Sequence, residues 1–234
     1  MVLLEEMSKL SIALKAWRSP VSDALNDGRF FSSSSAAGSK WRPIVRALVG
    51  TDKSAFAEIL GFPHFHFHPE CDGDNVFIIG KITTAPSTNI FSNREQEMLL
   101  RALSLRRLSF VLFTGDKNHF LTQLPSIQEK LVDTLRNVST PIVQSEVYMC
   151  IRVLLCRLSA HNLTSFWPVI LTEMVWKSIS HNGLRTLTLS VQYRLFEQAL
   201  LHTPVDGSDE LPLILSACKF LDLLLVLQTE EFQV

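Results

Sequence analysis

The sequence predicts an all-α protein, built as an irregular solenoid of stacked helix pairs of the HEAT or armadillo kind in a single domain. Hydrophobic residues make up 47% of the 234 residues and only 9 are glycine, which is typical of a globular, helix-rich chain. Helix-start signals recur: Ser92 and Ser126 each precede a glutamate by three residues, and Thr140 precedes a proline. These closely spaced starts indicate stacked helices, and the lack of a fixed sequence period indicates irregular repeats.

The N-terminal part of the chain also carries helical patterns. Apolar residues between positions 2 and 17 recur at spacings that place them on one helical stripe, and Ser19 with Pro20 is predicted to end that helix. A short helix follows to about Asn26, and the serine-rich stretch at 28–40 is predicted to be a surface loop. The helical period resumes at 41–60.

Two later segments are apolar enough to be buried. Polar residues are few at 140–159, and a helix that is apolar nearly all round packs between neighbours. The segment at 211–227 contains Lys219 and Asp222 and is shorter than the roughly 20 residues that cross a bilayer. We therefore expect a buried helix there rather than a membrane span.

Charge and cysteine usage limit the class of protein. The net charge is −1 and the basic residues are dispersed, so we expect no nucleic-acid partner. The four cysteines show no CxxC spacing, which fits a reducing compartment. Glu5 and Glu6 interrupt the apolar run that a secretory signal needs, so we expect no secretory signal at this N-terminus.

Residues 61–80 differ from their surroundings. His64, His66 and His68 alternate with phenylalanines, so an extended strand would place the three imidazoles on one face, and Cys71 follows closely. Imidazole and thiolate are ligands that zinc or copper prefers. A metal site is therefore one hypothesis for this segment.

Signatures of catalysis and of cofactor binding are missing from the sequence. The sequence does not contain the motifs GxGxxG, GxxxxGK[ST], GxSxG or HExxH. It therefore lacks the minimal motifs for phosphate cradling, for nucleophile-elbow catalysis and for helix-borne zinc chemistry. We expect no enzyme activity and no cofactor.

The chain contains three long and distinctive segments, LSLRRLSFVLFTGDKNHFLTQLPSIQEKLVD, LCRLSAHNLTSFWPVILTEMV and LPLILSACKFLDLLLVLQ. These segments resemble the C-terminal region of the Dopey family of very large membrane-trafficking proteins. The resemblance implies one helical domain formed by residues 1–60 and 81–234. Because the family pattern passes almost directly from position 60 to position 81, a retained intron or a loop insert is the favoured explanation of 61–80, ahead of the metal site.

The resemblance also implies a function. Dopey chains are several times longer, so the sequence reads as a fragment or a partial gene model. We expect a non-enzymatic scaffold or adaptor in endosome-to-Golgi and Golgi vesicle trafficking, peripheral on those membranes in the cytoplasm. The implied partners are a giant Sec7-related scaffold and a phospholipid-flippase ATPase. A generic α-solenoid interaction module with another cargo is the alternative.

Two surfaces are candidates for contacts. The densest basic region of the chain contains Arg94, Arg101, Arg106 and Arg107. Such a region suits contact with anionic phosphoinositide headgroups. The alternative interpretation is that these are ordinary solvated or salt-bridged arginines.

The second surface lies in the last apolar segment. Leu213, Phe220 and Leu227 recur every seven residues with Leu224 between them, which is a short coiled-coil-like seam for self-association. Core packing explains the same pattern, whereas self-association agrees with the zipper-like C-terminal segments of Dopey proteins.

Overall fold

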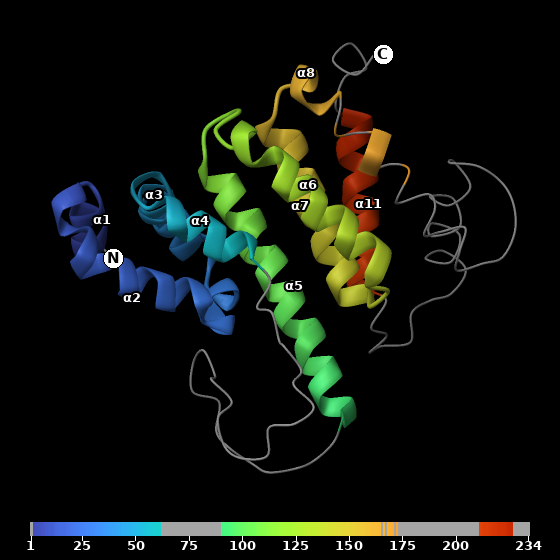
Figure 1. Ribbon diagram of the computed structural model, residues 1–234, viewed down its shortest axis with the longest axis horizontal. Helices are drawn as coiled ribbons and strands as arrows, with labels where there is room; N and C mark the ends of the chain where they lie inside the picture. Colours follow the sequence, from blue (N-terminus) through green and yellow to red (C-terminus); the bar gives the residue numbers. More distant parts are fainter. Residues whose placement is uncertain are drawn as a thin grey trace, which may run out of the picture. The chain divides into compact units, whose positions relative to one another are not determined.

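In the computed structural model, the described residues form helices and connecting turns, and none of them lies in a strand (Figure 1). The predicted all-α class is confirmed, while the stacked-pair solenoid stays a prediction. The described residues are 2–61, 90–164, 166, 168–170, 172 and 211–226.

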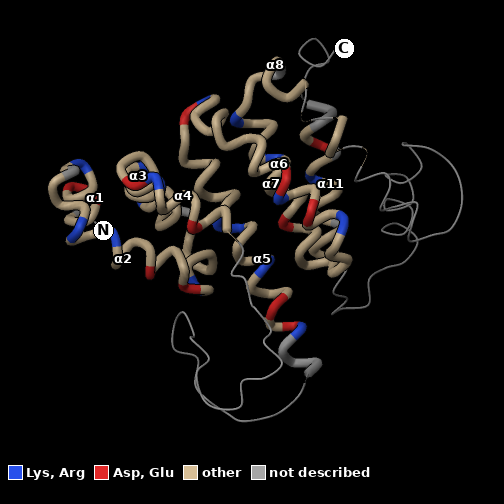
Figure 2. Tube along the Cα trace, in the orientation of Figure 1, with Lys and Arg blue, Asp and Glu red and all other residues tan. Residues whose placement is uncertain are grey.

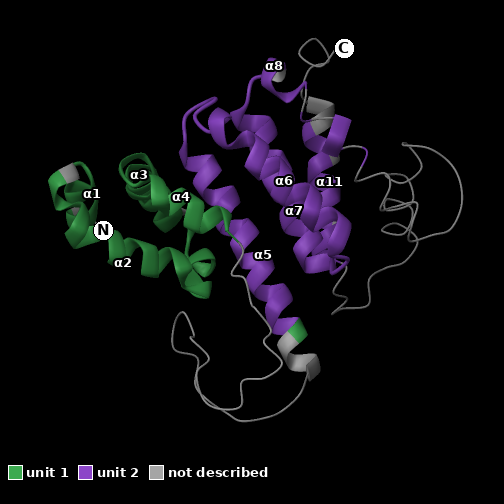
Figure 3. Cartoon of the chain, in the orientation of Figure 1, with its two compact units in different colours: residues 1–94 green, residues 95–234 purple. Residues whose placement is uncertain are grey.

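The chain divides into two compact units, Met1–Arg94 and Glu95–Val234, each described here by itself (Figure 3). The expected single domain interrupted at 61–80 stays a prediction, because that interruption lies, apart from Gly61, outside the described residues. No helix in the described ranges is both long and apolar enough to span a bilayer.

The first unit consists of short helices around a small core. Its elements are α1 (Val2–Ser8), η1 (Ser11–Ala13), α2 (Leu14–Asn26), η2 (Gly28–Ser32), α3 (Ser35–Thr51) and α4 (Lys53–Leu60). The core centres on Trp17 and Val21 of α2 with Ile44 and Leu48 of α3, all fully buried. Each pair is spaced i, i+4, so one face of each helix supplies the contact.

Two expectations for this unit are wrong. Pro20 lies inside α2, which continues to Asn26, and the burial of Trp17, Val21 and Leu25 on one face compensates for the backbone hydrogen bond that proline cannot make. The serine-rich stretch is mainly helical, because Ser34 caps α3 by accepting a hydrogen bond from the Ala37 amide at 3.4 Å.

The second unit contains longer helices. They are α5 (Ile90–Thr114, most of which belongs to this unit), η3 (Leu121–Gln123), α6 (Leu124–Asn137), α7 (Pro141–Arg157), α8 (Ala160–Leu163) and α11 (Leu211–Val226). The helix α7 lies among the others, as its apolar sequence predicts, with Val143, Val147, Ile151 and Leu154 buried. It packs along α11, where the rings of Tyr148 and Phe220 are 5.6 Å apart.

Of the three helix starts predicted at Ser92, Ser126 and Thr140, the structure agrees with the one at Thr140. Thr140 is the N-cap residue of α7 with Pro141 in its first turn, as predicted. Ser126 is not a cap, because α6 already begins at Leu124 with a proline in its first turn. Ser92 likewise follows the start of α5 at Ile90.

Candidate functional site

A buried polar cluster lies among α5, α6 and α7 of the second unit. Lys130 is 6% exposed and Glu146 is 3% exposed, and Ser104, Ser109 and Cys150 are buried with them in an otherwise aliphatic core. Buried charges are costly unless they are paired, so this cluster is the least expected feature of the core.

Glu146 joins α7 to α5. Its Oε1 accepts a hydrogen bond from Arg106 Nε at 2.9 Å and pairs also with Nη2 of the same guanidinium. The Oε2 atom is buried and has no hydrogen-bond partner among the described residues. Because the Arg106 side chain is 42% exposed and the Glu146 side chain only 4%, the arginine reaches from the surface to a carboxylate inside the core.

Lys130 and Cys150 have strongly shifted acidities. Lys130 Nζ donates a hydrogen bond to Ser104 Oγ at 3.3 Å, and burial lowers the pKa of this amine to about 8. Burial raises the pKa of the Cys150 thiol to about 12, against the opposing effects of a hydrogen bond with Ser109 and the nearby lysine. Cys150 is therefore a protonated thiol at neutral pH, which is a poor nucleophile and metal ligand.

Three contacts align α5 with α7. Arg106 pairs with Glu146, Ser109 hydrogen-bonds to Cys150, and the Arg157 guanidinium carbon lies 4.5 Å from the centre of the Phe113 ring. Residue numbers rise together along both helices, so α5 and α7 run in the same direction. The arrangement can hold two helices in a fixed register, which is a structural role.

A second fixed point joins the turn after α5 to the end of α7. Asn118 has a left-handed backbone, with φ of 65°, and its amide donates to the Arg157 carbonyl at 2.8 Å. Its Oδ1 accepts hydrogen bonds from the Ser159 amide at 2.9 Å and from Asn162 Nδ2 at 3.2 Å. Asparagine suits this position because it tolerates the left-handed region.

Gly115 in the same turn is close to an aromatic ring. A Cβ atom at this position would lie 2.5 Å from Cε2 of Phe120, which is too close for any other residue without movement of the ring. The turn therefore depends on both its glycine and its asparagine.

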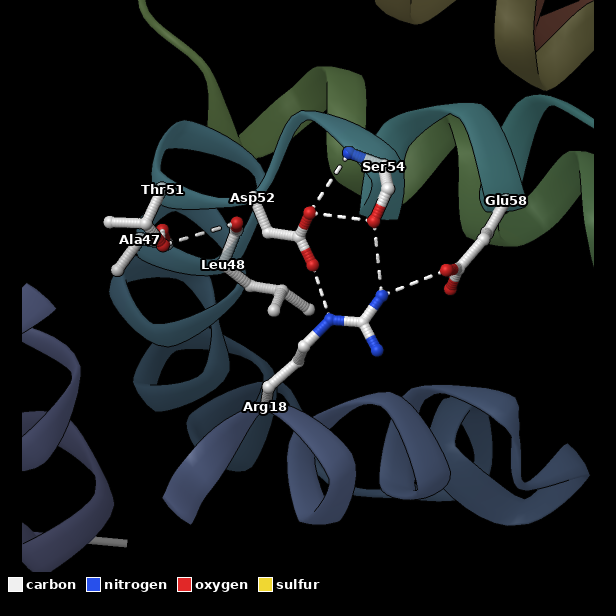
Figure 4. A network of polar contacts seen from close by, with 7 residues as sticks. All are labelled: Arg18, Ala47, Leu48, Thr51, Asp52, Ser54 and Glu58. Atoms are coloured by element: carbon white, nitrogen blue, oxygen red, sulfur yellow. Dashed lines mark hydrogen bonds and ion pairs between the residues drawn. The ribbon is translucent and has the colours of Figure 1, made fainter. Parts of the chain in front are cut away.

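An ion-pair network in the first unit joins α2 to α4 (Figure 4). Arg18 pairs with Asp52 through Nε, and its Nη2 donates to Glu58 at 2.8 Å and to Ser54 Oγ at 3.2 Å. Asp52 also caps α4, because its Oδ1 accepts from the Ser54 amide at 2.9 Å. The Ser54 hydroxyl and the Arg18 guanidinium lower the pKa of Asp52 to about 2.

Basic and acidic residues are interspersed along the helices of each unit (Figure 2). Of the predicted basic region, Arg94 is exposed, Arg101 pairs with Glu97 at 2.8 Å and Arg106 pairs with Glu146. Burial lowers the pKa of Arg107. Two of the four arginines thus form salt bridges, as the alternative interpretation of this basic region expects. Contact of the region with lipid headgroups stays a prediction.

The predicted self-association seam is partly accounted for by packing within the chain. Phe220 is 1% exposed and packs against Tyr148 of α7, whereas Leu213 is half-buried. The side chain of Leu224 and the whole of Leu227 lie outside the described residues. Leu215, which lies outside the seven-residue seam but belongs to the same apolar helix, is 49% exposed on α11.

The predicted metal ligands His64, His66, His68 and Cys71 also lie outside the described residues. Within the described ranges, no group of three or more His, Cys, Asp or Glu residues is placed to hold a metal ion. Sequence reasoning missed the cluster around Lys130; a single lysine on the apolar stripe of a helix was the available signal.

Comparisons with known proteins agree with the sequence resemblance. The family model described as DOP1 C-terminal matches residues 1–234. The protein pad-1 of Caenorhabditis elegans is 31% identical over 227 residues, which cover 96% of this chain and 8% of that protein. The DOP1 homolog of Drosophila melanogaster is 35% identical over 174 residues, covering 74% of this chain and 6% of that protein.

The match extends to fungi. The dop1 protein of Emericella nidulans is 26% identical over 238 residues, covering all of this chain and 11% of that protein. The chain thus spans about a tenth or less of the length of these relatives. No solved structure matches it. The resemblance to Dopey proteins is confirmed, and the chain belongs to the DOP1 C-terminal family.

Proposed function

We propose that this chain is part of a non-enzymatic scaffold or adaptor that acts in endosome-to-Golgi and Golgi vesicle trafficking. The observation that carries the proposal is the family match over residues 1–234. The fixed helix register around Glu146 and the locked turn at Asn118 support a role in presenting a rigid surface. The chain contributes a binding surface to a longer protein and works in the cytoplasm, peripheral on Golgi and endosome membranes.

The proposed partners are a giant Sec7-related scaffold and a phospholipid-flippase ATPase. The test is purification of the tagged chain from cells, followed by immunoblots for both partners and by fractionation of Golgi membranes. Leu154→Ala, which removes a core side chain that is 1% exposed, should lose the partners through instability. Lys117→Met at an exposed position is the matched control and should retain them.

The proposal fails if the folded chain, verified by circular dichroism, recovers neither partner and does not fractionate with Golgi membranes. Recovery of a different cargo complex would instead favour a generic helical interaction module.

Self-association through α11 is a further part of the proposal. Leu211 and Leu215 are 40% and 49% exposed there, and exposed leucines one turn apart form a small apolar patch. Light scattering at micromolar concentration should show a dimer that Leu215→Glu weakens. A monomer at that concentration would exclude it.

Contact with anionic phosphoinositide headgroups is proposed for the exposed Arg94. Co-sedimentation with vesicles that contain a phosphoinositide should exceed that with phosphatidylcholine vesicles, and Arg94→Glu should reduce it. Equal sedimentation with both vesicle types would contradict the contact.

A further inference from the structure

We draw no further inference here: the strongest candidate, the group of exposed apolar side chains that Leu3, Leu10 and Ile12 present along α1 and η1 of the first unit, carries none, because nothing in the structure shows what covers it.

Discussion

Replacement of the buried Lys130 by methionine should stabilise the second unit at neutral pH. The pKa of this amine falls from the ordinary 10.5 to about 8, mainly because burial disfavours the charged form, while nearby Cys150 opposes the shift. At 1.36 kcal/mol per pKa unit, holding the charged lysine in the core costs about 3 kcal/mol. Losing the hydrogen bond to Ser104 costs about 1 kcal/mol, so Lys130→Met should raise the free energy of unfolding by about 2 kcal/mol at pH 7.

The same shift makes the wild-type stability depend on pH. Below pH 8 both the folded and the unfolded chain carry the Lys130 proton, and the full cost of burial is present. As the pH rises from about 8 toward 10.5, the folded chain releases this proton and the unfolded chain keeps it, so the free energy of unfolding increases. The raised pKa of Cys150 acts in the opposite direction above pH 9, where the unfolded chain loses the thiol proton first.

Urea unfolding followed by far-UV circular dichroism between about pH 7 and 9 isolates the effect of Lys130. The wild type should gain about 1 kcal/mol over this range, and Lys130→Met should gain none. Lys117→Met removes the same charge from an exposed position of the same unit and should leave the pH dependence intact. A wild type with equal stability at both ends, or a Lys130→Met variant less stable than the wild type at pH 7, would refute the reasoning.

Substitutions at three more positions test the packing and the polar contacts. Leu154→Ala should lower the free energy of unfolding by about 2 to 5 kcal/mol in urea unfolding, and a loss no larger than that of the exposed control Leu10→Ala would show that the α7 core is misassigned. Asn118→Ala should lower the free energy of unfolding by about 2 kcal/mol, and Asn118→Gly should lower it by about 1 kcal/mol. The loss is smaller for glycine because glycine adopts the left-handed backbone easily, although it makes no side-chain hydrogen bonds. Equal losses would contradict the role of φ. The hydrogen bonds of Asp52 with Ser54 and Arg18 contribute about 1 kcal/mol above pH 3.8 after solvent screening, and this contribution is lost as the pH falls toward 2. Asp52→Asn should remove that acid dependence, and a dependence that persists in urea unfolding would place its origin elsewhere than Asp52.

Local sequence signals predicted those parts of the fold that consecutive residues determine. Thr140 and Pro141 mark the start of α7 because a proline in the first turn loses no hydrogen bond. The nearly all-apolar composition after them predicted burial, which the structure confirms. Pro20 misled the prediction because the packing of Trp17 and Val21, which depends on α3, outweighs the local preference of proline to end a helix.

The polar cluster could not be predicted in the same way. Arg106 and Glu146 are forty positions apart, and no periodicity within either helix pairs them. Asn118 follows a glycine in a short turn, which indicates a turn but not that its side chain binds the end of α7. Such contacts depend on how the helices pack, which is a property of the whole unit.

The buried charges therefore have an effect that a purely apolar core would lack. Moving α7 by one residue along α5 would rotate Glu146 by about 100° away from Arg106 and leave both charged groups without their partner. The same movement would separate Cys150 from Ser109 and Arg157 from Phe113. Apolar contacts tolerate such a slip far better, since they lack direction. Burial of Lys130 costs stability, whereas the directional contacts of Arg106 with Glu146 specify one register of α7 along α5.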